Sequence, residues 1–283
     1  MKNIFITIIQ VIGYFFAIFL IIALLVIPTQ LLLGNQDSLE QRLQILILGV
    51  HILIGVGIVN TLILISVKSQ LIKMGWPEYK TSLRWLGIGT LLGLLVSGGV
   101  IILIWLTGGG SFSLANDRFS DYLQYIIPLI LFLFVAALGE EWMFRGYPLT
   151  KFSKSFGFVW ANVLVSLLFM AGHWGGNGWG LLTAINIFLF SLINGAIRFS
   201  PGGIPAAWGF HFAWNSLYVI LGAPLTGERF EIPFIQFLSD GPVLLSGGNY
   251  GPEGSIATFI MLIAGLIFLY KCLHRRSGVI NLK

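Results

Sequence analysis

The sequence is poor in charged residues and has a single cysteine. Of its 283 residues, 10% are charged and 57% belong to the hydrophobic set, whereas a soluble domain carries about a quarter of its residues as charges. So few charges cannot cover a water-facing surface, which excludes a soluble globular domain and a disordered chain. Cys272 has no partner for an internal disulfide, so a disulfide-stapled secreted domain is excluded too. The surplus apolar side chains must face lipid.

Long apolar runs predict membrane-spanning helices. A helix needs roughly 20 apolar residues to cross a hydrocarbon core of about 30 Å. The runs lack the alternation of barrel strands, and lipid offers backbone groups no partners, so each run is expected to be helical. We predict an all-α integral membrane protein with eight transmembrane helices and one polytopic domain over residues 1–283. The runs cover about 4–33, 43–67, 85–106, 122–147, 157–173, 180–197, 204–221 and 255–272.

The basic residues predict the orientation of these helices. They are scattered rather than clustered, so we expect no nucleic-acid partner and interpret them as topology signals. With the N-terminus in the cytoplasm, the 16 Lys and Arg residues divide into 13 inside and 3 outside, as the positive-inside rule requires. We therefore expect N-in, C-in topology, in the plasma membrane of a bacterium. The inner bases are Lys2, Lys68, Lys73, Lys80, Arg84, Arg145, Lys151, Lys154, Arg198, Lys271, Arg275, Arg276 and Lys283.

Two further features follow from this topology. Residues 222–254 form a long outer loop, in which residues 232–235 are apolar enough to enter the membrane interface. Gly89 and Gly93, inside the third run, form a small-xxx-small pattern that predicts close packing against another helix.

Ionisable side chains inside the apolar runs are candidate functional residues, because each costs several kcal/mol there unless it is paired or hydrated. Glu141 precedes Arg145 by four residues, an order that favours a helical ion pair. Glu140 points about 100° away around the same helix and has no local partner. His51 stands alone in the second run and is interpreted as a hydrogen-bonded structural histidine.

The depths of the remaining polar residues predict that they converge. If the fourth and fifth runs form an antiparallel hairpin with its turn at residues 153–157, Glu140 and His173 lie side by side. The fourth helix must then continue beyond the membrane into the cytosol, and Pro148 is the expected position of a kink. His211 and Asn215 are four residues apart and share one face of the seventh helix. We expect these polar residues to converge in the cytosolic half of the bilayer.

One carboxylate, two imidazoles and an amide suit the addition of water to a carbonyl group. Glu140 can take a proton from water, and His173 can hold that water or share the proton. His211 and Asn215 can donate hydrogen bonds to the developing oxyanion. The alternative is a zinc site formed by Glu140, His173 and His211, although no HExxH motif is present and the ligands are far apart in sequence.

Three motifs in this order resemble those of the CPBP family of intramembrane proteases. That family contains CAAX prenyl endopeptidases of the Rce1 type and bacterial bacteriocin-processing or immunity relatives. The specific match covers residues 120–222. The motifs are EExxxR at Glu140-Glu141-Trp142-Met143-Phe144-Arg145, FxxxH from Phe169 to His173, and HxxxN from His211 to Asn215.

The resemblance implies a fold, an activity and roles for single residues. It implies eight helices around a polar cavity open to the cytosol, and an endopeptidase that cleaves membrane-bound or prenylated proteins or peptides. It leaves open whether a metal takes part. By position, Glu140 is the water-activating base with His173 as its partner, His211 and Asn215 form the oxyanion site, and Glu141 with Arg145 supports the site structurally.

Two other function classes stay open at this point. A non-proteolytic membrane scaffold or immunity factor could use the same fold, because an intact site makes proteolysis possible but does not show that it takes place. A transporter also buries Glu, Arg and His, but no inverted repeat of broken helices is visible in the sequence.

Overall fold

The computed structural model consists mainly of helices, so the all-α prediction is confirmed. It describes residues 2–33, 41–66, 74–115, 118–230, 232 and 234–277. A long helix covers each of the eight predicted apolar runs. These helices are α1 (Lys2–Leu33), α2 (Gln41–Ser66), α3 (Tyr79–Leu106), α4 (Phe119–Arg145), α5 (Tyr147–Gly172), α6 (Leu181–Arg198), α7 (Gly203–Ile220) and α9 (Ile256–Ser277).

Several of these helices can cross a membrane. By length and composition the candidates in the described chain are 4–32, 46–66, 79–106, 119–172 and 181–198, and the fourth of these combines α4 with α5. The chain is a multi-pass integral membrane protein. The count of eight crossings and the orientation stay predictions. Lys68, Lys73 and Lys283, which contribute to the predicted orientation, lie outside the described residues.

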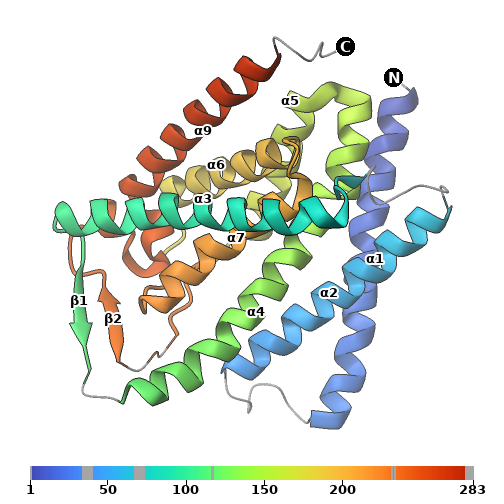
Figure 1. Ribbon diagram of the computed structural model, residues 1–283. Helices are drawn as coiled ribbons and strands as arrows, with labels where there is room; N and C mark the ends of the chain where they lie inside the picture. The colour runs from blue at the N-terminus through green and yellow to red at the C-terminus, as the bar shows by residue number, and fades with distance from the viewer. Residues whose placement is uncertain are drawn as a thin grey trace.

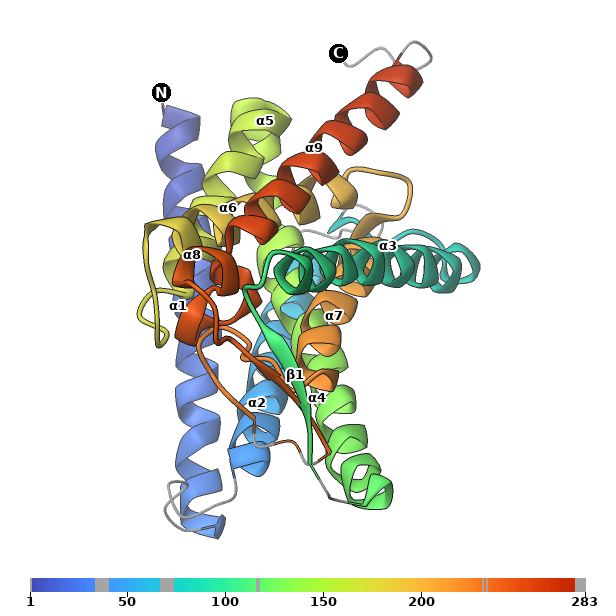
Figure 2. The same cartoon turned by 90° about the vertical axis from the view of Figure 1, so that its left-hand side faces the viewer.

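The helices are not a simple parallel bundle. In both views α1 runs along the height of the molecule and α3 lies across it (Figures 1 and 2). The start of α1, the bend within α5 and the end of α9 lie at one end of the molecule, whereas the end of α1 and the start of α4 lie at the other. This arrangement agrees with termini on a common side, and the identity of that side stays a prediction.

α4 and α5 form the predicted hairpin. Gly157 interrupts the helical geometry of α5 with φ +76° and ψ 167°, a conformation that glycine adopts without steric cost. The expected turn at residues 153–157 is therefore confirmed. The kink expected at Pro148 is misplaced: α4 ends at Arg145 with Gly146 as its C-cap, and Pro148 lies in the first turn of α5, where its missing N–H breaks no helical hydrogen bond.

α3 and α7 pack at close range, as the glycine pattern predicts. A Cβ atom on Gly89 would collide with the backbone of Ala206, and one on Gly93 would collide with the backbone of Phe210. α7 begins at Gly203, which has φ +58°, and Ile204 N–H donates to the Gly75 carbonyl at 2.8 Å. These contacts hold α7 in the interior, where most of its residues are buried.

The segment 222–254 folds onto the helices. It contains β2 (Ile235–Leu238), α8 (Val243–Ser246) and the 3₁₀ turns η3 (Gly248–Tyr250) and η4 (Pro252–Gly254). β2 pairs antiparallel with β1 (Ser111–Leu114), which lies beside it in Figures 1 and 2. Ile232 is 1% exposed and belongs to the main core. The prediction that this residue enters the membrane interface is therefore wrong, because it packs against protein instead.

His51 is hydrogen-bonded, as expected. Its Nε2 lies 2.9 Å from the Thr29 hydroxyl, and that hydroxyl donates to the Leu25 carbonyl. Because the hydroxyl proton is already used, Nε2–H of His51 is the donor to Thr29. The histidine thus joins α2 to α1.

Candidate active site

Glu141 is fully enclosed between a cation and an imidazole. Its side chain is 0% exposed, and its Oε2 lies 3.4 Å from Nε of Arg145, also 0% exposed. The ion pair predicted from the spacing is present. The other oxygen, Oε1, accepts a hydrogen bond from Nδ1 of His211 at 2.8 Å. Glu141 therefore has both oxygens engaged and holds α7 against α4.

Arg145 connects α4 to two further helices. Its Nη2 donates to the Ser191 hydroxyl on α6 at 2.8 Å. Its guanidinium carbon lies 4.6 Å from the centre of the Phe169 ring on α5, within the range of a cation–π contact. The four-residue spacing of Glu141 and Arg145 therefore builds a charged cluster that joins α4 to α5, α6 and α7.

Glu140 faces the two site histidines. Its Oε2 lies 3.9 Å from Nε2 of His173 and 3.9 Å from Nε2 of His211. Glu140 and His173 are thus adjacent, as the hairpin predicts. The separations exceed a hydrogen bond, and one water molecule can bridge such a gap. Within the described chain, Oε2 of Glu140 is buried and has no hydrogen-bond partner.

Phe169 orients His173. Its carbonyl oxygen lies 2.8 Å from Nδ1 of His173, and a carbonyl can only accept, so Nδ1 carries the proton. The two rings lie 4.3 Å apart. Nε2 of neutral His173 is therefore a hydrogen-bond acceptor, and it points at Glu140.

His211 has the same arrangement. Nδ1 donates to the Glu141 carboxylate, and Nε2 faces Glu140. Nε2 of His211 can therefore donate to an oxyanion only when the ring is protonated on both nitrogens. Asn215 follows one helical turn later on α7 and is half-buried.

A third carboxylate, Glu253, was not expected at this site. It belongs to η4, is 4% exposed, and accepts hydrogen bonds from Trp214 Nε1 at 3.0 Å and from the Thr226 N–H at 2.7 Å. It interacts electrostatically with both His173 and His211. The sequence offered only a weak signal, an acid within the turn that precedes the last apolar run.

The donor set does not suit zinc. A tetrahedral zinc ion with bonds of 2.0–2.1 Å holds its ligand atoms about 3.4 Å apart, whereas Oε2 of Glu140 lies 3.9 Å from each imidazole nitrogen. Over the residues that the structure describes, no group of three or more His, Cys, Asp or Glu side chains is arranged to hold a metal ion.

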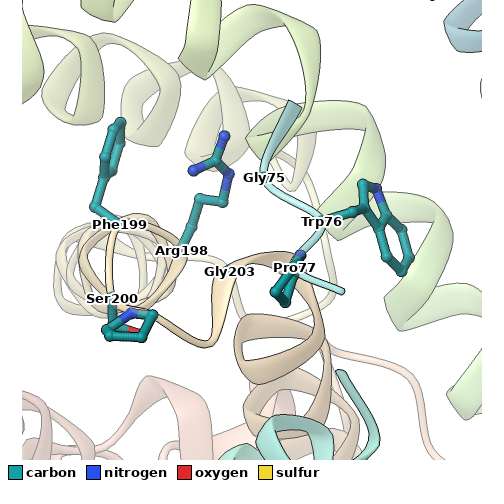
Figure 3. Close-up of a pocket in the computed structure, with 8 residues that line it drawn as sticks. Gly75, Trp76, Pro77, Arg198, Phe199, Ser200 and Gly203 are labelled. Carbon is teal, nitrogen blue, oxygen red and sulfur yellow. The ribbon is translucent and has the colours of Figure 1, made fainter. Parts of the chain in front are cut away.

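A separate cavity of about 200 Å³ lies between the turn from α6 to α7 and residues 75–77 (Figure 3). None of the predicted site residues lines it. Arg198 lines this cavity and donates to the Arg145 carbonyl at 3.1 Å and to the Thr150 hydroxyl at 3.2 Å. Arg198 thus supports the end of α4.

Comparison with known proteins agrees with this site. Residues 122–217 match a protein family described as type II CAAX prenyl endopeptidase Rce1-like, and the three motifs lie within them. The chain is also similar to an uncharacterised 24.3 kDa protein of Escherichia coli, with 32% identity over 99 residues that cover 34% of this chain and 45% of that protein. The chain thus spans less than half the length of this relative.

The predicted resemblance is therefore confirmed over residues 122–217, which match the Rce1-like family. Because that family is described as an endopeptidase, the match supports a protease function at the level of the family. Glu253 lies outside the matched residues.

Proposed function

We propose that the Rce1-like domain makes this chain an intramembrane endopeptidase in which Glu140 activates water. The observation that carries the proposal is the position of Glu140 Oε2, 3.9 Å from Nε2 of both His173 and His211. A carboxylate oxygen that is buried and accepts no hydrogen bond within the described chain is available to take a proton, which a general base requires.

The first step is the attack of water on the peptide carbonyl. The water oxygen bonds to the carbonyl carbon, one water proton moves to Glu140, and the carbonyl electron pair moves to oxygen. Nε2 of neutral His173 accepts a hydrogen bond from the second water hydrogen and so orients the nucleophile. The hydrogen bond between His173 Nδ1 and Phe169 supports this role, because it keeps the lone pair on Nε2.

The developing oxyanion needs donors. Asn215 supplies an amide N–H, and His211 supplies Nε2–H in its imidazolium form. Glu141 supports that form, because its carboxylate accepts from Nδ1 of the same ring. In the proposed mechanism Glu141 and Arg145 position His211 and do not touch the substrate.

The tetrahedral intermediate then collapses. The C–N bond breaks, the proton held by Glu140 moves to the leaving amine, and the products are a carboxylic acid and an amine. All atoms are accounted for without a covalent enzyme intermediate. No step in this proposal passes through a metal.

The substrate class follows from where the site lies. Its side chains come from α4, α7 and the end of α5, and α4 and α5 lie in a stretch that can span the membrane. A peptide bond that reaches them must belong to a membrane-associated or lipidated protein or peptide, consistent with CAAX-type processing. We place the protein in the plasma membrane of a bacterium, with N-in, C-in topology and a site open to the cytosol.

A comparison of membrane proteomes tests the proposal. Cells that express the wild type, Glu140→Gln or Glu78→Gln are searched for new C-terminal fragments of membrane proteins. Glu78 is an exposed acid at the start of α3 and serves as the matched control. We expect fragments with the wild type and Glu78→Gln that are absent with Glu140→Gln. Identical fragment patterns in all three would favour a non-proteolytic scaffold.

A further inference from the structure

Glu253 is a buried acid held by uncharged groups. Its carboxylate accepts hydrogen bonds from two uncharged donors, the Trp214 indole and the Thr226 backbone. Within the described chain, no lysine or arginine forms an ion pair with it. A buried carboxylate is costly unless its oxygens are hydrogen-bonded, and here each oxygen accepts one bond.

The position of this carboxylate is fixed from several sides. Asn186 on α6 donates to the backbone carbonyl of Glu253 at 2.8 Å and to that of Ser255 at 2.9 Å. Thr226 has φ +51°, a strained conformation for a residue with a branched side chain, and its N–H is the one that Glu253 accepts. The surrounding backbone therefore holds the acid in place.

Glu253 is coupled to the site through α7. Trp214, which donates to it, directly precedes Asn215. The Trp214 ring lies 5.2 Å from the Phe190 ring, which in turn lies 5.1 Å from the His211 ring. The indole is 1% exposed, so its hydrogen bond helps to set the rotation of the helical turn that carries both proposed oxyanion donors.

The surroundings of Glu253 act on its carboxyl group. Burial raises the pKa of the Glu253 carboxyl, while the bonds from Trp214 and Thr226 and the two histidines lower it. The other titratable groups that face it are the phenols of Tyr218 and Tyr250. His211 itself also faces Glu140 and Glu141.

We propose that Glu253 is a positioning residue of the intramembrane protease. Through Trp214 it sets the turn of α7 that presents His211 and Asn215. This inference rests on the proposed function. In this proposal the segment 222–254 places a third carboxylate, Glu253, next to the site.

The split between kcat and KM separates this role from a structural one. Trp214→Phe removes the indole donor, so the turn of α7 that carries His211 and Asn215 loses its hydrogen bond to Glu253. We expect kcat to fall about 3- to 10-fold with KM unchanged, because misplaced oxyanion donors weaken the binding of the transition state and not that of the substrate. A purely structural role would lower the yield of folded protein and leave kcat and KM of the folded fraction unchanged.

Glu253→Asp shortens the reach to Trp214, and we expect a kcat loss similar to that of Trp214→Phe. Glu253→Gln keeps an acceptor oxygen for Trp214 and serves as the conservative variant, whose kcat stays closer to that of the wild type. Full kcat in both Glu253→Asp and Trp214→Phe would overturn the positioning role.

The Glu140→Gln variant, measured in parallel, separates the two proposals. If Glu140→Gln keeps its activity, the protease mechanism itself fails. If Glu140→Gln is inactive while Trp214→Phe and Glu253→Asp keep the kcat of the wild type, only the inference about Glu253 fails.

Discussion

Glu140 and Glu141 are neighbours in the sequence and have opposite environments. Glu141 is 0% exposed and has Arg145 at one oxygen and His211 at the other. Glu140 is 27% exposed, and its Oε2 has two imidazole nitrogens at 3.9 Å and no hydrogen bond within the described chain. The helical rotation of about 100° between adjacent residues is enough to separate them.

The difference assigns different tasks to the two acids. A carboxylate whose oxygens are both engaged cannot accept a further proton without losing a partner, so Glu141 suits the positioning of His211. A carboxylate with a free oxygen beside two imidazole nitrogens suits the activation of water. The motif therefore pairs one acid for chemistry with one for structure.

The largest expected effect is the loss of cleavage rate when Glu140 is substituted. Glu140→Gln keeps the shape of the side chain and removes the base, so the cleavage rate falls by about 10²–10⁴-fold, the range of general-base catalysis. The melting temperature stays within a few degrees of the wild type, because the Oε2 of Glu140 takes part in no hydrogen bond. Single-turnover cleavage and thermal unfolding in detergent measure the two quantities. A destabilised but active Glu140→Gln variant would reverse the proposed assignment.

Asn215→Ala tests the oxyanion site and the metal question together. Loss of one donor lowers the rate by about 10²–10³-fold. A chelator leaves the purified wild type active, and its zinc content stays well below one per chain, because Glu140, His173 and His211 are too widely spaced for a tetrahedral ion. Stoichiometric zinc that is lost and regained together with activity would contradict this expectation and make the two histidines ligands.

For Glu141, whose carboxylate contacts Arg145 and His211, substitution mainly lowers the folding stability. Glu141→Gln leaves Arg145 as an uncompensated buried cation, which costs about 3–5 kcal/mol of folding free energy. The double variant Glu141→Gln/Arg145→Met removes the orphaned charge, so it recovers part of the stability but not the activity, since His211 has lost its carboxylate acceptor. Thermal unfolding measures the recovery. Equal stability of the single and double variants would exclude the ion pair as the reason for burial.

Much of this architecture could be predicted from the sequence. The long apolar runs gave eight helices, because lipid permits few other structures for a chain of this composition. Gly157 marked the hairpin turn, and equal distances from that turn placed Glu140 beside His173. Periodicity within one helix also gave the pair of Glu141 and Arg145.

Contacts between distant segments could not be predicted in this way. The hydrogen bond between His211 and Glu141 joins α7 to α4, and it depends on side-chain rotamers that no spacing encodes. The bend at Gly146 was missed because Pro148 is the stronger signal for a kink. Glu253 was missed because it lies outside the motifs, in a segment whose route over the helices depends on tertiary packing.

The smallest expected effect concerns the stability contributed by Glu253. Burial raises the pKa of its carboxyl above the ordinary value of 4.5, so the folded state binds this proton more tightly than the unfolded state does. The stabilisation by the neutral carboxyl is complete below the unfolded pKa and is lost as pH rises through the folded pKa.

Glu253→Gln has no proton to lose. The stability of this variant minus that of the wild type therefore increases as pH rises above about 4.5. The hydrogen bond lost with the second carboxylate oxygen shifts this difference by the same amount at every pH and does not change its slope. Melting temperatures of both proteins across this range measure the difference, with Glu78→Gln as the exposed control whose difference stays flat. A Glu253→Gln difference that also stays flat would mean that the folded protein does not penalise the Glu253 charge. The hydrogen bonds that Glu253 accepts from Trp214 and Thr226 would then compensate its charge, as the partners of Glu141 do for that acid.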